Sequence, residues 1–160
     1  MKYLKKTIIF LCFVLLVFSG WFLHIWITPE KPAKIVEKTV VEQVAEMDFS
    51  LYKLANKERK KKMVWNPCLA NKAEERAKDI FETKLFSHED RNGKIPYKTI
   101  INMCIEYAHA GENLSTDFQH PEEAHYALMN SPTHKANIIG DYTDMGVGCF
   151  ENVCVEFFAK

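Results

Sequence analysis

A run of 22 residues without a charged side chain divides this chain of 160 residues and limits where the remainder can fold. Residues 7–28 contain no Asp, Glu, Lys or Arg. A bilayer core of about 30 Å requires roughly 20 apolar residues in a helix, so the run is long enough to cross it. Lys2, Lys5 and Lys6 precede the run, and such lysines favour a cytoplasmic N-terminus. The pattern predicts a single-pass signal anchor with the rest of the chain on the extracytoplasmic side of the cell membrane.

A cleaved signal peptide is the alternative interpretation of the same segment. Ser19 and Gly20 offer small residues at a cleavage site. The apolar run continues beyond them with bulky residues, which favours an uncleaved anchor. Both interpretations export the remaining chain, as a membrane-bound protein in the first case and as a secreted protein in the second.

The chain divides into four predicted segments. They are a cytoplasmic basic region at 1–6, the anchor at 7–28, a spacer at 29–47 and a folded domain at 48–160. The domain has the length of one ordinary globular unit. Outside the three N-terminal lysines the chain has 18 basic and 21 acidic residues, so its charge gives no indication of nucleic acid as a partner.

The sequence of the domain predicts an α+β fold in which helices flank a small, mostly antiparallel sheet. Apolar residues at helical spacing and capping signals predict helices over 48–61, 67–84, 96–103 and 121–130, and a last short helical turn that carries His134. Two strand-like runs follow at the C-terminus. This order of elements is typical of helices packed on both faces of a sheet.

Four cysteines lie outside the anchor, and an even number in an oxidising compartment predicts two disulfides. If Glu151–Asn152 is a hairpin turn, Cys149 faces Cys154 at a distance that a disulfide can bridge. The pair Cys68–Cys104 follows by elimination. A zinc site built from these cysteines is the less favoured alternative, because the chain has no Cys-x-x-Cys pair.

Three residues that are distant in sequence carry the side chains for a polar or metal site. His88 follows the second predicted helix, Glu112 lies in a predicted Gly-Glu-Asn-Leu turn, and His134 begins the last helix. Two imidazoles and a carboxylate are suitable ligands for a divalent cation such as zinc and leave a position open for water. Their spacing is not a metal signature, and each residue has a structural alternative as a cap or as a turn-stabilising group.

The remaining histidines and the known nucleophile motifs give no second site. His109, His120 and His125 are expected at the surface, where His125 can pair with Glu122 or Glu123 on the same helix. The sequence has no Gly-x-Ser-x-Gly elbow and no phosphate-binding loop. We therefore predict no catalytic residue and regard an enzymatic activity as the less favoured hypothesis.

At these residues the domain resembles the CAP superfamily, which contains cysteine-rich secretory proteins, antigen five and plant pathogenesis-related proteins, and most of all its bacterial, SCP-domain branch. The resemblance spans about 48–160 and rests on five motifs in order. They are Leu54–Arg59, Phe86–His88, Gly111–Leu114, Asn130–Ile138 and Tyr142–Gly148.

The resemblance implies a three-layer α-β-α sandwich. It also implies a central cavity lined by two His and two Glu, which binds a divalent cation in several members. His88, Glu112 and His134 match three of these positions, and the fourth falls at Asn130, where an amide replaces the carboxylate.

Three functions are compatible with these features. The first is a membrane-tethered extracytoplasmic binding module whose cavity holds a small polar or lipid ligand, with or without a divalent metal. The second is a metal-dependent hydrolase, for example a peptidase, in which Glu112 is a ligand or a general base. The third is a structural or adhesion protein at the cell surface. The expected partners are the membrane, through residues 7–28, and an unidentified small molecule, lipid or surface component.

Overall fold

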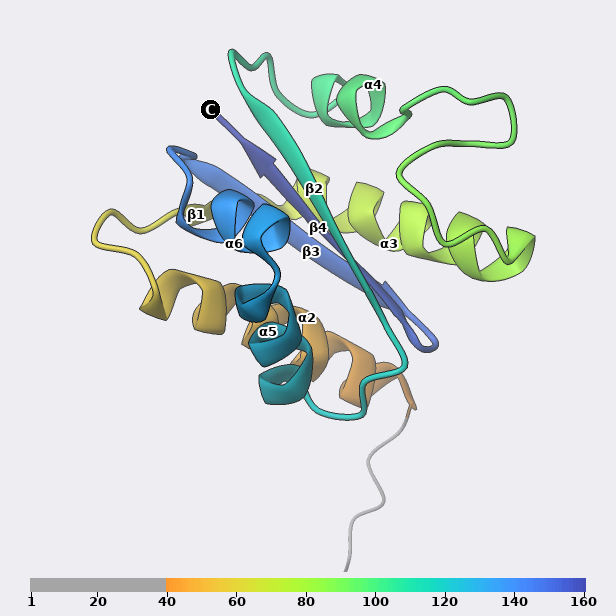
Figure 1. Ribbon diagram of the computed structural model, residues 1–160, viewed down its shortest axis with the longest axis horizontal. Coiled ribbons are helices and arrows are strands. Elements are labelled where there is room, and N and C mark those ends of the chain that lie inside the picture. The colour runs from red at the N-terminus through yellow and green to blue at the C-terminus, as the bar shows by residue number, and fades with distance from the viewer. Residues whose placement is uncertain (1–39) are drawn as a thin grey trace, which may run out of the picture. The chain divides into compact units, whose positions relative to one another are not determined.

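The computed structural model describes residues 40–160, which form a four-stranded sheet with helices on both faces (Figure 1). The helices and strands are α2 (Val40–Lys57), β1 (Val64–Trp65), α3 (Pro67–Thr83), α4 (Tyr97–Asn102), β2 (Ala110–Thr116), α5 (Pro121–Asn130), α6 (Pro132–Ile139), β3 (Asp144–Phe150) and β4 (Val153–Ala159). Within this part of the chain, none of the helices has the length and apolar character needed to cross a bilayer. The predicted anchor at 7–28 lies outside the described residues.

The sheet is mixed and mostly antiparallel, with the strand order β1-β3-β4-β2. β4 pairs antiparallel with both β3 and β2, whereas the short strand β1 runs parallel to β3. The α+β class and the mostly antiparallel sheet predicted from the order of elements are therefore confirmed. β2, which carries Glu112, is at one end of this order.

Helices cover both faces of the sheet, and each face has its own hydrophobic cluster (Figure 1). Leu51 of α2, Leu128 of α5 and Ile138 of α6 pack on one face together with Phe158. Residues of α3 and α4 pack on the opposite face together with Phe157. Neighbouring residues of a strand point to opposite faces, so β4 is buried along its whole length.

The C-terminal hairpin has the predicted register. Phe150 is paired with Val153 and Cys149 with Cys154, around the turn at Glu151–Asn152. Both predicted disulfides are present, with Cα–Cα distances of 4.1 Å for Cys149–Cys154 and 5.6 Å for Cys68–Cys104.

Side-chain hydrogen bonds to the backbone explain where α3 starts and where α2 ends. Asn66 caps α3 as predicted, because its side chain accepts hydrogen bonds from the backbone N–H of Cys68 and Leu69. The first helix was predicted at 48–61, but α2 spans Val40–Lys57. It ends early because the Asn56 side chain bonds both the N–H and the carbonyl of Met63, which turns the chain towards β1.

The segment Gly111–Leu114 was predicted as a turn, and this prediction was wrong. It is the central part of strand β2, which pairs with β4 from Ala110 to Thr116. Gly111 to Ser115 are all buried, so the segment lacks the alternation of polar and apolar residues by which a half-exposed strand is recognised.

Candidate functional site

The carboxylate of Glu112 is the centre of the candidate site. Its side chain is fully buried, and Oε1 lies 2.7 Å from Nδ1 of His88. His88 belongs to the loop that follows α3, and its side chain is 47% exposed. The ring of His88 therefore connects a buried carboxylate on the sheet with the solvent.

Arg76 of α3 is a third member of this site. Its buried guanidinium places Nε 3.6 Å from Oε2 of Glu112, and Nη2 donates to the carbonyl of Ser87 at 2.7 Å. Nη1 donates to Asp79 at 2.9 Å. Arg76 thus holds the residue that precedes His88 and places a positive charge beside the buried carboxylate.

Arg76 was not among the residues predicted from the sequence, although the sequence contains a signal for it. Arg76 lies three residues after Ala73 and one before Ala77, on the apolar side of α3. An arginine among core positions of an amphipathic helix needs a buried partner, because an unpaired charge is costly to bury. This rule indicates a buried acid but does not tell which one.

His134 of α6 is half-buried and lies close enough to His88 for their charges to interact. Burial lowers the pKa of His134, and the positive charge of His88 lowers it further. Both effects favour the neutral form of the His134 ring. A neutral imidazole can accept a hydrogen bond or bind a cation, which a protonated ring cannot do.

Two asparagines fix α6 to strand β2. Asn137 donates to the backbone carbonyl of Glu112 at 3.1 Å and to Oδ1 of Asn113 at 2.8 Å. Asn113 in turn donates to the backbone carbonyl of His134 at 3.2 Å. Asn113 lies in the motif Gly111–Leu114 and Asn137 in the motif Asn130–Ile138, but only the fold shows that they join Glu112 to the helix that carries His134.

Asn130 has a different setting. It is exposed, and its side-chain amide donates to the carbonyl of Tyr126 within α5 at 2.8 Å. The hydrogen bond described for Asn130 therefore stabilises its own helix. Its role as a fourth cavity residue stays a prediction.

The contacts of Glu112 bear on whether its side chain can bind a metal ion. Among residues 40–160, no group of three or more His, Cys, Asp or Glu side chains is arranged to hold a metal ion. Oε1 of Glu112 already contacts Nδ1 of His88, and the cation of Arg76 lies beside Oε2. Because Arg76 would repel a divalent cation at Oε2, this arrangement fits a polar ligand better than a metal.

His125 was expected at the surface beside Glu122 or Glu123, and this expectation was wrong. The residue is only 7% exposed, and its Nε2 lies 3.5 Å from Oε1 of Glu58, the residue that follows α2. His125 faces inward because Ala124 and Leu128 on the same side of α5 belong to the hydrophobic core.

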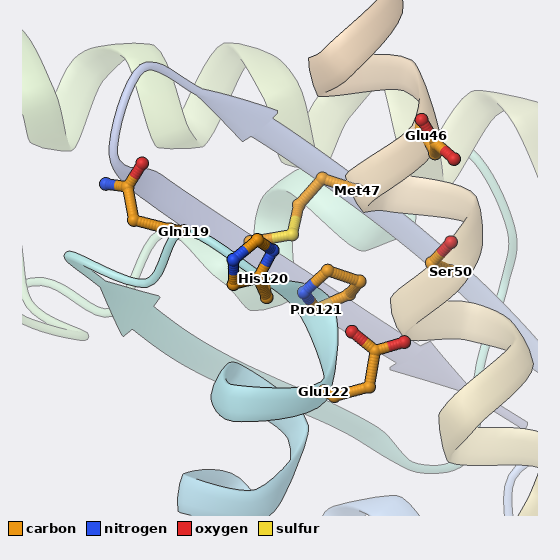
Figure 2. Close-up of a pocket in the computed structure, with 7 residues that line it drawn as sticks. All are labelled: Glu46, Met47, Ser50, Gln119, His120, Pro121 and Glu122. Carbon is orange, nitrogen blue, oxygen red and sulfur yellow. The ribbon is translucent and has the colours of Figure 1, made fainter. Parts of the chain in front are cut away.

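A separate hollow of about 660 Å³ lies between α2 and the segment that leads into α5. Figure 2 shows side chains from these two segments around it. Its lining residues are Glu46, Met47, Ser50, Gln119, His120, Pro121 and Glu122. The hollow contains none of the predicted site residues and provides a reference region for binding experiments.

Glu156 of β4 is a buried acid joined to the candidate site through Asn113. Its Oε2 accepts a hydrogen bond from Asn113 at 3.0 Å, and its Oε1 has no hydrogen-bond partner. Burial raises the pKa of Glu156 to about 7, against the opposing effect of the Asn113 bond. The folded protein therefore holds a proton here that the unfolded chain releases near 4.5, the ordinary pKa of a glutamate.

We expect Glu156→Gln to stabilise the protein by about 1 to 2 kcal/mol at pH 8 and by less at pH 5. Between pH 4.5 and about 7 Glu156 binds more protons in the folded state than in the unfolded state, so its contribution to the stability of the wild type falls as pH rises. Glutamine is neutral throughout and removes this loss, although its new N–H₂ group needs a partner. Urea unfolding at both pH values measures the difference.

Asp48→Asn tests the same effect at a second buried acid. Burial and the nearby Glu74 carboxylate raise the pKa of Asp48 to about 7, although a hydrogen bond with the backbone of Cys149 lowers it. The variant should show the same trend with pH, independently of Asn113. An equal gain from Glu156→Gln at pH 5 and pH 8 would contradict the assignment.

Comparison with known proteins identifies a family and several structural neighbours. The sequence matches the model of the cysteine-rich secretory protein family, CAP, over residues 54–157. An extracellular protein from Bacillus anthracis that contains an SCP domain superposes with a TM-score of 0.68 at 19% identity, over 77% of this chain and 44% of that one. No curated protein matches the sequence.

Two further structures show the same fold. An outer surface protein from Borrelia burgdorferi has a TM-score of 0.61 and 23% identity over 69% of this chain and 89% of that chain. A cysteine-rich secretory protein from Staphylococcus aureus has a TM-score of 0.63 and 19% identity over 76% and 40%. The chain thus spans less than half of the Bacillus and Staphylococcus proteins.

Proposed function

Because this chain belongs to the cysteine-rich secretory protein family, we propose that it is an extracytoplasmic binding protein held at the membrane by residues 7–28. Its ligand site consists of His88, Glu112 and His134, and its ligand is a small polar molecule or the polar part of a lipid. The observation that carries this proposal is the buried carboxylate of Glu112, which contacts the half-exposed ring of His88.

Burial and charge at Glu112 support a binding role. Burying a carboxylate away from water costs free energy unless the charge is paired. Oε1 of Glu112 is paired with His88, and the guanidinium of Arg76 lies near Oε2. Such a fixed polar group beneath an accessible imidazole can orient a ligand that hydrogen-bonds to the ring. His134, whose pKa is lowered, offers a second, neutral imidazole.

The cysteines support binding over nucleophilic chemistry. All four cysteines in the described part of the chain are in disulfides, so none of them offers a thiolate to pair with His88 or His134. The extracytoplasmic location agrees with these disulfides, because such bonds persist in oxidising compartments.

We expect His88→Ala and His134→Ala each to weaken ligand binding at least about tenfold, which corresponds to the loss of one good polar contact. The probes are glycerol phosphate and a short-chain phosphatidylglycerol, titrated into the full chain in detergent micelles and followed by NMR chemical shifts. The shifts caused by a bound probe should centre on residues around Glu112. His120→Ala, in the reference hollow, is the matched control and should leave the affinity unchanged.

The competing outcomes are distinct. Probe binding that survives both histidine substitutions, or that is lost only in His120→Ala, would overturn the assignment of the site. Zinc titration tests the metal-dependent alternative: stoichiometric zinc that is lost in the His88→Ala/His134→Ala double variant would favour a metal centre.

A further inference from the structure

Residues 49–65 concentrate positive charge in a domain that is otherwise acidic. This stretch has six basic residues and one acidic residue, whereas the other described residues have nine basic and eighteen acidic residues. Arg59 is buried and donates to backbone carbonyls, including those of Ile138 and Tyr142. The lysines of the stretch are exposed: Lys53, Lys57, Lys60, Lys61 and Lys62.

Three aromatic rings lie within the same stretch. Phe49 stacks on Tyr52 with ring centroids 5.5 Å apart, and Trp65 meets both rings edge-on at 5.6 and 5.2 Å. Phe49 is 47% exposed, and Val64 beside Trp65 is 66% exposed. Lys53 places Nζ 5.2 Å from the centre of the Phe49 ring. Apolar rings and lysines therefore share one surface of α2 and β1.

We propose that this basic–aromatic face, formed by Phe49, Tyr52, Lys53, Lys57 and Trp65, docks onto an anionic phospholipid bilayer. The proposal rests on the membrane tether of the proposed function and adds to it the face of the domain that meets the lipid. The exposed ring of Phe49 can enter the boundary between headgroups and acyl chains, and lysines reach anionic headgroups while their apolar stems stay against the rings.

The length of the connecting chain allows this contact. Eleven residues, 29–39, separate the end of the predicted anchor from the start of α2 at Val40. A chain of this length spans at most about 40 Å, so it limits how far the start of α2 can lie from the end of the predicted anchor. The excess of acidic residues on the rest of the domain would be repelled by anionic lipid, which favours the basic face as the one that approaches.

A bilayer explains the combination of residues better than an anionic polymer does. Lysines alone are sufficient to bind a soluble polyanion, which gains little from an exposed Phe49 or Val64. Exposed apolar groups gain free energy only where they leave water, as at the boundary between headgroups and acyl chains. Shielding of the aromatic rings from water therefore distinguishes a bilayer from a soluble polyanion as the partner.

The test uses the full chain with Trp21→Phe and Trp26→Phe, so that Trp65 is the remaining tryptophan, placed in lipid nanodiscs. On changing from pure phosphatidylcholine to about one quarter phosphatidylglycerol, quenching of Trp65 by acrylamide should fall about twofold and recover in about 0.5 M sodium chloride. Lys53→Gln/Lys57→Gln and Phe49→Ser should each abolish the change. Lys78→Gln/Lys98→Gln removes the same charge from α3 and α4 and should preserve it.

Each other result overturns a specific claim. Equal quenching in both lipids, or loss of shielding in the α3 and α4 control, would overturn docking by this face. If soluble polyphosphate shielded Trp65 from acrylamide as well as the anionic lipid does, and also did so in Phe49→Ser, the partner of this face would be an anionic polymer instead. Extraction of the wild-type chain from membranes by alkaline carbonate would overturn the tether itself, whereas an intact tether without Trp65 shielding would leave the proposed function standing.

Discussion

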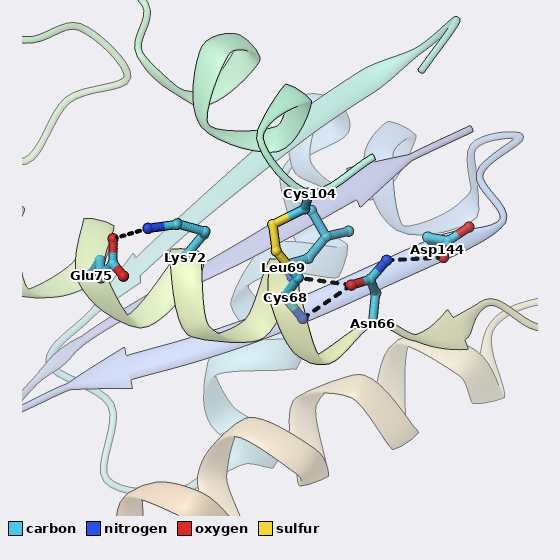
Figure 3. Close-up of a disulfide and its surroundings, with 7 residues drawn as sticks. All are labelled: Asn66, Cys68, Leu69, Lys72, Glu75, Cys104 and Asp144. Atoms are coloured by element: carbon cyan, nitrogen blue, oxygen red, sulfur yellow. Dashed lines mark hydrogen bonds and ion pairs between the residues drawn. A yellow bond between two sulfur atoms is a disulfide. The ribbon is translucent and has the colours of Figure 1, made fainter. Parts of the chain in front are cut away.

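Replacing Cys68 and Cys104 together by alanine is expected to lower the free energy of unfolding by about 4 kcal/mol. The disulfide joins the first turn of α3 to the turn that follows α4 across a sequence separation of 36 residues (Figure 3). In the chain-entropy model its loss frees a long loop in the unfolded state. Cys68 is exposed and Cys104 partly exposed, so alanine leaves little cavity to complicate the result. Urea unfolding at neutral pH measures the change.

Two comparisons separate the cross-link from its side chains. Lys72→Ala/Met103→Ala changes neighbours on the same two segments without removing a disulfide and should cost less than about 1 kcal/mol. Cys149→Ala/Cys154→Ala opens a much shorter loop, with a separation of 5 residues, and should lose about 2 kcal/mol of cross-link stabilisation. If the Cys68/Cys104 variant were no less stable than the surface control, the entropic argument would fail.

Local signals predicted the elements that local chemistry determines. Asn66 and Pro67 indicated the start of α3 because a cap and a first-turn proline act within one helical turn. The hairpin register followed from a two-residue turn, and the register then determined which cysteines meet. The partner of Cys68 followed only because two cysteines remained.

Contacts between distant segments could not be predicted in this way. Strand β2 is buried by β4 on one side and by helices around it, so its sequence carries no alternating pattern. The early end of α2 depends on Asn56 reaching Met63, a contact that no propensity of Lys57 or Glu58 indicates. Such positions are determined by tertiary packing rather than by local preference.

The candidate site was predicted in part for the same reason. The sequence shows the chemistry of three side chains, those of His88, Glu112 and His134. The family motifs led to the prediction that these three residues line one cavity. Arg76 and Asn137 act through contacts that depend on how α3 and α6 pack around β2. Their side chains are common ones, so only the fold shows that they determine the environment of Glu112.

Gly148→Ala should destabilise the protein by about 3 kcal/mol, because α3 packs directly on the backbone of β3. A Cβ atom at Gly148 would lie 2.1 Å from the backbone N of Glu74 and 2.7 Å from the carbonyl oxygen of Ala70. Gly146 meets the same helix, with 2.3 Å to the backbone N of Ala70. These obstacles are main-chain atoms, so the helix must move away from the sheet to admit a methyl group. Thermal and urea unfolding of each variant measure the loss.

A second substitution tests whether the backbone of α3 is the obstacle. Ala73→Gly removes a methyl group from the part of α3 that faces Gly148 but leaves the main chain in place, so Gly148→Ala/Ala73→Gly should be no more stable than Gly148→Ala alone. Because α3 also carries Arg76, a displaced helix should lengthen the contact between Arg76 and Glu112 and shift the NMR signals of His88. Recovery of wild-type stability in the double variant would show that side-chain crowding, and not the backbone, limits how closely α3 approaches the sheet.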